Sequence, residues 1–231
     1  MADASLTWLG HASFRLDTPG GQRVYVDPWL EENPRCPSSE RVPERVDLIV
    51  LTHGHKDHVG DTLALWSVHR PPIVAQLELR SWLESHGVEE DITLAPNKGG
   101  TVEAAGIQVS LTDAKHSSSA PDGTYTGEPT GVVLRLEDDT RLYFAGDTCV
   151  FGDMELIARL HRPDVAVLPI GGHFTMDPPQ AAIALELLGV RRCVPCHYGT
   201  YPFLTGTPAE LERLAPDVQV LAPGPGETVS L

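Results

Sequence analysis

A nearly continuous apolar run that leads directly into a dense group of histidines most constrains what this chain can fold into. Residues 46–51 (VDLIVL) have the length of a strand and are almost wholly apolar, which is typical of a strand buried on both faces. The next residues include His53, His55, Asp57 and His58. These side chains therefore lie just past the C-terminal end of a buried strand, where layered α/β folds place functional loops.

Short strands and helices alternate through the rest of the chain. The pattern predicts helices over residues 57–66, 76–85, 152–160, 178–188 and 208–214. It predicts further strands over residues 5–9, 13–16, 23–27, 92–94, 101–104, 107–111, 132–136, 141–145, 164–169 and 192–196. His116, Asp147 and His197, like His53, each follow a strand-like segment, which allows four strand ends to converge on one site.

No linker or low-complexity tract divides the 231 residues, so we predict a single domain over 1–231 with two halves, about 1–113 and 114–231. The net charge of −15 repels polyanions, which argues against nucleic acid and stable membrane association as partners. The absence of a signal peptide and the four scattered cysteines favour a cytoplasmic protein. The sequence leaves the oligomeric state open, a homo-oligomer included.

Three imidazoles and one carboxylate fall within the six residues from His53 to His58, a density that is rarely structural. Neutral imidazole and carboxylate groups suit zinc, iron or manganese. Ligands that share one short loop lose little entropy when they close around a metal ion, and Gly54 lets the backbone turn tightly between them. The segment therefore predicts a metal site.

The segment resembles the HxHxDH signature of the metallo-β-lactamase superfamily. The remaining positions of that family are filled in order: His116 matches the third histidine of the first metal, Asp147 the bridging aspartate, and His197 the last histidine. The resemblance extends from residue 24 to about residue 199. It implies an α/β (α+β) fold, the four-layer αββα sandwich.

The same resemblance implies two divalent metal ions. His53, His55 and His116 would bind the first ion, and Asp57, His58 and His197 the second. Asp147 and a hydroxide would lie between them. We expect zinc, although manganese, iron and nickel accept the same ligands. Two such ions lower the pKa of the shared water, and Asp57 would accept a proton and help the leaving group depart.

Further segments narrow the resemblance to hydrolases similar to ascorbate-6-phosphate lactonase. These are WLGHASF from Trp8, DPW from Asp27, GGHFTMDP from Gly171 and HYGT from His197. The first two of these segments, WLGHA from Trp8 and DP from Asp27, also resemble N-acylphosphatidylethanolamine phospholipase, which is much longer. The resemblance implies a dinuclear hydrolase that cleaves a lactone, phosphodiester or related ester of a small, anionic metabolite.

Three residues outside the ligand set are also candidates. In the superfamily, an aspartate at the position of Asp27 hydrogen-bonds the metal loop. His11 and His173 lie in glycine-flanked turns, where either could line the site, and we predict that His173 stabilises developing charge on the substrate.

Two alternatives to a small-molecule hydrolase remain open. A nuclease of the same superfamily is disfavoured by the acidic charge. A non-hydrolytic metal-binding or diiron redox protein is disfavoured because that branch carries Glu where His55 stands.

Two of the three lysines, Lys56 and Lys115, flank predicted ligands, either as ordinary loop residues or as positive charge for an anionic substrate. Cys193 and Cys196 precede His197 in a haem-attachment spacing, which we interpret instead as packing of a buried strand; Cys149 is also expected to pack.

Overall fold

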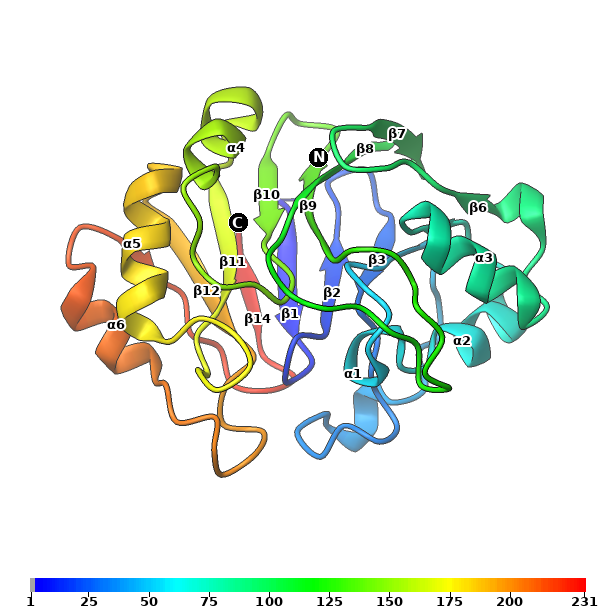
Figure 1. Ribbon diagram of the computed structural model, residues 1–231, viewed down its shortest axis with the longest axis horizontal. Helices are drawn as coiled ribbons and strands as arrows, with labels where there is room; N and C mark the ends of the chain where they lie inside the picture. Colours follow the sequence, from blue (N-terminus) through cyan, green and yellow to red (C-terminus); the bar gives the residue numbers. More distant parts are fainter. Residues whose placement is uncertain (1–2) are drawn as a thin grey trace.

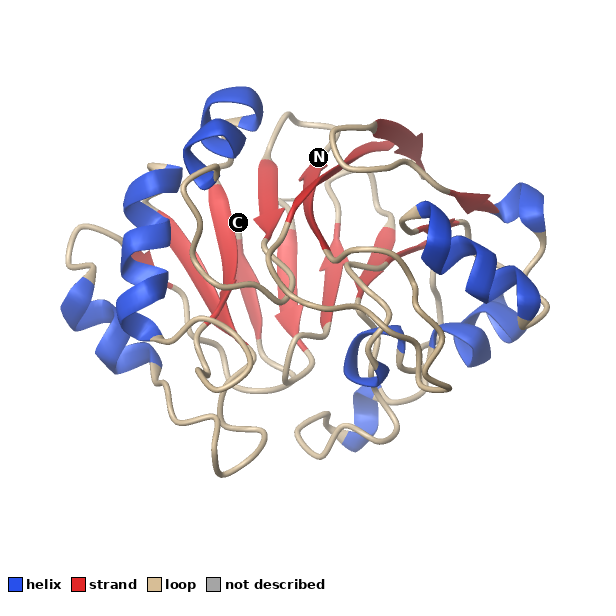
Figure 2. Ribbon diagram, in the orientation of Figure 1, coloured by secondary structure: helices blue, strands red, loops and turns tan. Residues whose placement is uncertain are grey.

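The computed structural model describes residues 3–231, and Met1 and Ala2, with which the predicted domain begins, lie outside the described residues. Two seven-stranded sheets lie against each other, and helices cover their outer faces (Figures 1 and 2). The first sheet has the order β14-β1-β2-β3-β4-β5-β6 and the second β13-β12-β11-β10-β9-β8-β7. This is the predicted αββα sandwich.

The first sheet begins as an antiparallel meander of β1, β2 and β3 and continues as parallel strands from β3 to β6. Its strands are β1 (Ser5–Trp8), β2 (Phe14–Asp17), β3 (Arg23–Val26), β4 (Leu48–Val50), β5 (Ile73–Val74), β6 (Thr93–Leu94) and β14 (Thr228–Ser230). The helices of this part are α1 (Lys56–Val59), α2 (Thr62–His69) and α3 (Leu77–Ser85), with 3-10 turns η1 (Ser38–Glu40) and η2 (Glu90–Ile92).

The second sheet is antiparallel from β7 to β10 and parallel from β10 to β13. Its strands are β7 (Thr101–Ala104), β8 (Ile107–Asp113), β9 (Thr130–Arg135), β10 (Arg141–Phe144), β11 (Val165–Pro169), β12 (Arg192–Cys196) and β13 (Gln219–Val220). Helices α4 (Met154–His161), α5 (Pro178–Leu188) and α6 (Pro208–Leu214) belong to this part. The chain passes from the first sheet to the second between Leu94 and Thr101, before the division into halves predicted at about residue 113.

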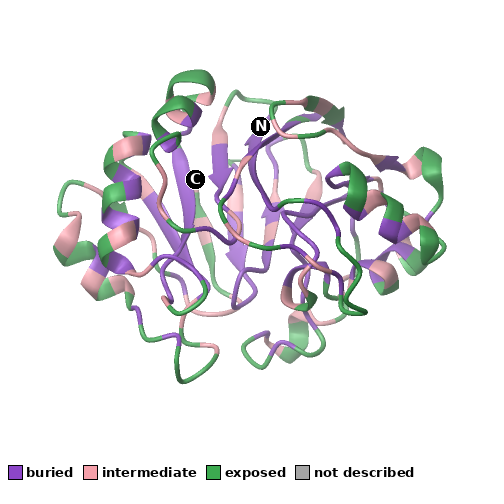
Figure 3. Cartoon of the chain, viewed as in Figure 1, coloured by how far each residue is buried: buried purple, intermediate pink, exposed green. Residues whose placement is uncertain are grey.

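Alternating side chains along the strands fill the space between the sheets and the space beneath the helices. Phe14 and Phe144, from opposite sheets, meet with ring centroids 5.7 Å apart. Ile49 faces the other way, into the apolar cluster under α2 and α3, and Tyr143 does the same under α4 and α5. Figure 3 shows this interior as a buried layer across both sheets. Rigid strands therefore support the loops at their ends.

Two details differ from the sequence predictions. The predicted helix over residues 57–66 is wrong: α1 ends at Val59 and α2 begins at Thr62. Gly60 separates them with φ +42°, and a Cβ there would lie 2.5 Å from Trp29 Cα, so the break requires glycine. The strands β5, β13 and β14 were not predicted; each has only two or three residues, which show no clear period.

Candidate metal centre

The predicted ligands lie on loops and on the short helix α1 at one edge of the two sheets, the lower edge in Figure 1. The chain leaves β4 after Val50 and reaches His53 three residues later. Helix α1 then begins at Lys56 and presents Asp57 and His58 from its first turn. His116, Asp147 and His197 follow β8, β10 and β12 of the second sheet, so both sheets contribute to one site.

The first group of ligand-type side chains contains His53, His55 and His116. One ring nitrogen from each lies within 4.8 Å of the other two. His53 Nε2 lies 3.0 Å from His55 Nδ1, and the ring centroids of His53 and His116 are 5.4 Å apart. His53 is buried, whereas the other two are half-buried and accessible from solvent. This is the trio that the resemblance assigns to the first metal.

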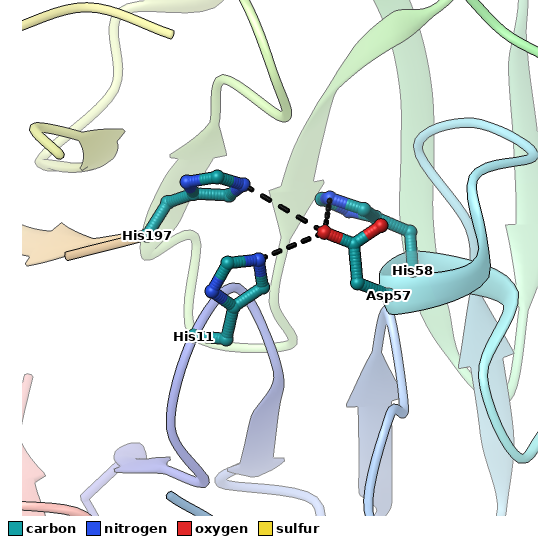
Figure 4. Close-up of side chains that lie close together, drawn as sticks. All are labelled: His11, Asp57, His58 and His197. Atoms are coloured by element: carbon teal, nitrogen blue, oxygen red, sulfur yellow. Dashed lines mark hydrogen bonds and ion pairs between the residues drawn. The ribbon is translucent and has the colours of Figure 1, made fainter. Parts of the chain in front are cut away.

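The second group contains Asp57, His58 and His197, and His11 joins it (Figure 4). Figure 4 shows the three histidines directed at Asp57 Oδ2 from the turn after β1, from α1 and from the end of β12. The distances from Asp57 Oδ2 to Nε2 are 2.9 Å for His11, 4.0 Å for His58 and 3.9 Å for His197. The structure thus adds His11 to the predicted trio.

Asp147 lies between the two groups. Its Oδ2 atom is 3.5 Å from His116 Nε2 and 3.2 Å from His197 Nε2, and its Oδ1 atom is 3.4 Å from His58 Nε2. One carboxylate therefore reaches a histidine of each group, as a bridging ligand must.

The ionisation of these side chains favours metal binding. Burial lowers the pKa of His53 well below its usual value and also lowers the pKa of His55 and His116. Burial opposes ionisation of Asp147, yet the nearby charges of His197 and His58 hold its pKa well below the usual range. Neutral imidazole and ionised carboxylate are the forms that bind a metal ion.

His58 differs from the other histidines. Burial by itself would lower its pKa, but the negative charges of Asp147 and Asp27 outweigh burial and raise the pKa well above the usual value. Two buried carboxylates therefore attract positive charge to this point, which is a property of a cation site.

Unpaired buried atoms test whether the residues fit a metal. His58 Nε2 and Asp147 Oδ1 are buried and only 3.4 Å apart, yet neither has a hydrogen-bond partner. Buried polar atoms without partners are rare in folded proteins because leaving them unpaired costs about 1–3 kcal/mol each. An imidazole nitrogen and a carboxylate oxygen that adjoin a set of other such donors fit one or two transition-metal cations.

Asp27 supports the loop rather than joining the ligand groups. It accepts hydrogen bonds from Thr52 N (2.8 Å) and Thr52 Oγ1 (2.6 Å), and its Oδ2 atom lies 2.7 Å from His58 Nδ1. Thr52 Oγ1 in turn lies 3.0 Å from His53 Nδ1. The aspartate therefore contacts His58 directly and His53 through Thr52, so it supports one histidine of each group.

The two other candidate histidines lie in different surroundings. His11 is 1% exposed, and its Nδ1 atom lies 2.9 Å from Thr200 Oγ1, a partner that the sequence analysis missed. Burial and the adjacent His197 lower the pKa of His11 to about 4. His173 is exposed and outside the ligand groups, with its ring against Phe174 and Phe203.

The cysteines and lysines complete the comparison with the sequence predictions. Cys193 and Cys196 are free and buried in β12, as predicted, but Cys149 is exposed, so its predicted packing is wrong. Lys56 pairs with Glu32, and Lys115 with Asp113. Both lysines flanking the ligands are therefore neutralised by carboxylates. Within residues 3–231, no helix is both long and apolar enough to cross a membrane.

Comparison with known proteins identifies the family. A family model described as "Beta-lactamase superfamily domain" matches residues 22–198. The UPF0173 metal-dependent hydrolase of Koribacter versatilis is 46% identical over 228 residues, covering 97% of each chain. Igni18, a metallo hydrolase from Ignicoccus hospitalis, has a TM-score of 0.88 at 34% identity and covers 100% of this chain and 99% of its own.

A more distant structure shares the fold alone. CmlA, a diiron β-hydroxylase from Streptomyces venezuelae, has a TM-score of 0.76 at 16% identity, with 55% of its chain covered. The fold therefore does not by itself separate hydrolases from other metal enzymes, and the sequence relatives decide the family. The chain belongs to the metallo-β-lactamase superfamily and is a metal-dependent hydrolase.

Proposed function

We propose that the protein is a dinuclear metal hydrolase that cleaves a lactone, phosphodiester or related ester of a small, anionic metabolite. The observation that carries the proposal is the position of Asp147, which lies within 3.5 Å of histidines from both ligand groups. The proposed ligands are those of the sequence prediction: His53, His55, Asp57, His58, His116, Asp147 and His197. Zinc is the first candidate, with manganese, iron and nickel as alternatives.

The chain's own residues would bind the metals and move the proton. Two metal ions held here would supply a nucleophile by lowering the pKa of a water and would polarise the substrate oxygen. Asp57 is the most open member of its group, since its side chain is 31% exposed against 0–1% for its three histidine neighbours. We assign the proton transfer to its carboxylate. The contact from His11 holds that carboxylate in place.

The substrate class rests on the chemistry of the site and on the resemblance to ascorbate-6-phosphate lactonase. Cations at the centre would attract an anionic ester. Lys56 and Lys115 supply little additional charge, because each is already paired with a carboxylate. The sequence predicts that His173 stabilises developing charge; because its side chain is exposed and outside the ligand groups, we assign it only a contact with the substrate.

A nuclease is the second hydrolase candidate. The net charge of −15 disfavours a polyanionic substrate, because the summed field slows its approach. A diiron redox activity has less support, because His55 lies in the first ligand group with its ring nitrogen 3.0 Å from His53.

Both sheets contribute ligands to one centre, and a shared apolar cluster joins them. This supports the proposal that residues 1–231 form one domain, which should unfold in a single transition.

Metal content tests the proposed site directly. Protein reconstituted with zinc or manganese and freed of excess metal should contain about two ions per chain by elemental analysis. His116→Ala should lower that number, whereas Cys193→Ser combined with Cys196→Ser should leave it unchanged. Only trace metal in the parent protein, or metal loss in the double cysteine variant, would contradict the ligand assignment.

Activity tests the proposed reaction. The reconstituted protein should be screened against lactones, phosphodiesters and thioesters, with Asp147→Asn as the control for metal-dependent turnover. Turnover by the parent and none by the variant is expected. Equal rates for the two proteins would contradict the proposal.

A further inference from the structure

Four exposed rings lie together beside the metal centre. His173 and Phe174 belong to the loop between β11 and α5, and Tyr201 and Phe203 to the loop between β12 and α6. Phe203 is the common neighbour, with ring centroids 5.4 Å from Tyr201, 4.8 Å from His173 and 5.6 Å from Phe174. We call these four residues the aromatic cluster. Both loops leave the same edge of the sheets in Figure 1.

The exposure of these rings is not explained by packing. Phe174 is 53% exposed, Phe203 45% and Tyr201 37%. The chain has only five phenylalanines and five tyrosines. Three of the four whose rings are largely exposed in residues 3–231 lie in this one cluster, and Tyr125 is the fourth. Isolated exposed apolar residues need no explanation, whereas a contiguous group marks a binding surface.

The cluster is continuous with the metal centre. The loop after β12 begins with His197, a proposed ligand, and continues through Thr200, which contacts His11. The next residue is Tyr201, whose ring centroid lies 6.1 Å from that of His11. His11 in turn contacts Asp57, the most open member of its group. A molecule at Asp57 would therefore lie beside the rings.

We propose that the aromatic cluster binds an aromatic group of the substrate while the ester-type bond lies at the metal centre. The stacked pair Tyr201 and Phe203, with an interplanar angle of 13°, offers ring faces and edges to a flat group. Aromatic rings prefer offset stacking or edge-to-face contacts with one another, which favours an aryl group over an aliphatic one of equal size. The reaction at that bond rests on the proposed function, but the binding of the aryl group does not.

A second copy of the chain is a weaker explanation of the cluster. A stable interface buries about 800 Å² on each partner, far more than three partly exposed rings provide. The link from Tyr201 through His11 to Asp57 is also what a substrate site requires and what a dimer contact does not.

Binding of inert carboxylates tests the aryl site without turnover. Phenylacetate, cyclohexylacetate and acetate share one carboxylate and differ only in the attached group, and their affinity for zinc-loaded protein can be measured by calorimetry. Phenylacetate should bind tightest. Phe203→Ala should lower the affinity for phenylacetate by about tenfold and leave the affinity for acetate unchanged. Phe203→Leu should bind phenylacetate no more tightly than cyclohexylacetate.

Matched variants keep the test specific. Leu160→Ala removes an exposed apolar side chain from α4, away from the cluster, and should change nothing. Unchanged metal content and melting temperature would establish that Phe203→Ala leaves the centre intact. Equal weakening of all three ligands, or no preference for phenylacetate in the parent protein, would overturn the proposal. So would a dimer that Phe203→Ala dissociates.

Hydrolysis separates this proposal from the proposed function. Dihydrocoumarin and δ-valerolactone carry the same six-membered lactone with and without an aromatic ring. The ratio of their kcat/KM values should fall about tenfold in Phe203→Ala, since the intrinsic reactivities cancel between proteins. An unchanged ratio in an active enzyme would overturn the aryl site alone. Phenylacetate binding without hydrolysis of any ester would instead contradict the proposed function alone.

Discussion

The turns that carry His11 and His173 are alike in sequence and backbone but differ in their surroundings. Each has a glycine before the histidine, and each histidine adopts a left-handed conformation, with φ +56° and φ +61°. A non-glycine residue with positive φ is uncommon, so both turns are held by their environment. Local sequence gives no reason to treat them differently.

The tertiary contacts separate the two histidines. His11 is enclosed by residues from two other segments, Asp57 of α1 and His197 and Thr200 of the loop after β12, and is almost fully buried. His173 has two aromatic neighbours and is exposed to solvent. We therefore expect His11 to act on the metal centre and His173 to contact a molecule bound next to it.

The largest expected effect is that of Asp57, the residue that connects His11 to the centre. Asp57→Ala removes both a proposed ligand and the partner of His11, so turnover should fall by about a thousandfold or more. Elemental analysis should show weaker retention of the second metal. A variant that keeps both metals and full turnover would contradict the inference that His11 acts on the centre through Asp57.

His11→Ala should lower kcat by about a hundredfold, because Asp57 loses the contact that holds its carboxylate in place. Steady-state kinetics and metal content are the measurements. The substitution should lower kcat and leave KM nearly unchanged. His11→Gln, which can still donate to Asp57, should recover part of the rate. If the two substitutions behave alike, His11 has a role other than positioning Asp57.

Thr200→Val should have a smaller effect of about tenfold on kcat, since it removes the hydroxyl beside His11 Nδ1 while keeping the shape of the side chain. The effect should disappear when the substitution is made in His11→Ala, which a double-mutant cycle measures. Additive losses would mean that Thr200 does not act through His11.

His173→Ala should have the smallest effect, about threefold to fivefold in KM for an aryl substrate, because the residue only contacts the bound group at an exposed site. Both metals and the melting temperature should be unchanged. A fall of about a hundredfold in kcat would instead assign His173 the charge-stabilising role that the sequence predicts, and would remove the distinction between the two turns.

Much of the fold was predictable because its signals are local. Residues 46–51 are apolar except for Asp47, and they contain the buried strand β4 that precedes the histidine loop. The helix over residues 178–188 has a proline at its start, an aspartate cap at Asp177 and Gly189 after it, and its bounds match the prediction. By contrast, the break at Gly60 depends on a close approach of Trp29, which no local pattern reveals.

The residue types of the site and the strand ends that carry them follow from the sequence alone. The HxHxDH spacing places His53, His55, Asp57 and His58 on one short segment, and chain connectivity alone keeps such neighbours together. Which distant side chains join these residues depends on how the two sheets pack. His11 enters the second group because the turn after β1 lies beside the end of β12, where His197 N donates a 2.8 Å hydrogen bond to His11 O. His173 lies outside the group, and its ring contacts those of Phe174 and Phe203 instead. Contacts between segments far apart in the chain are set by the packing of the two sheets, and no pattern within a single segment records them.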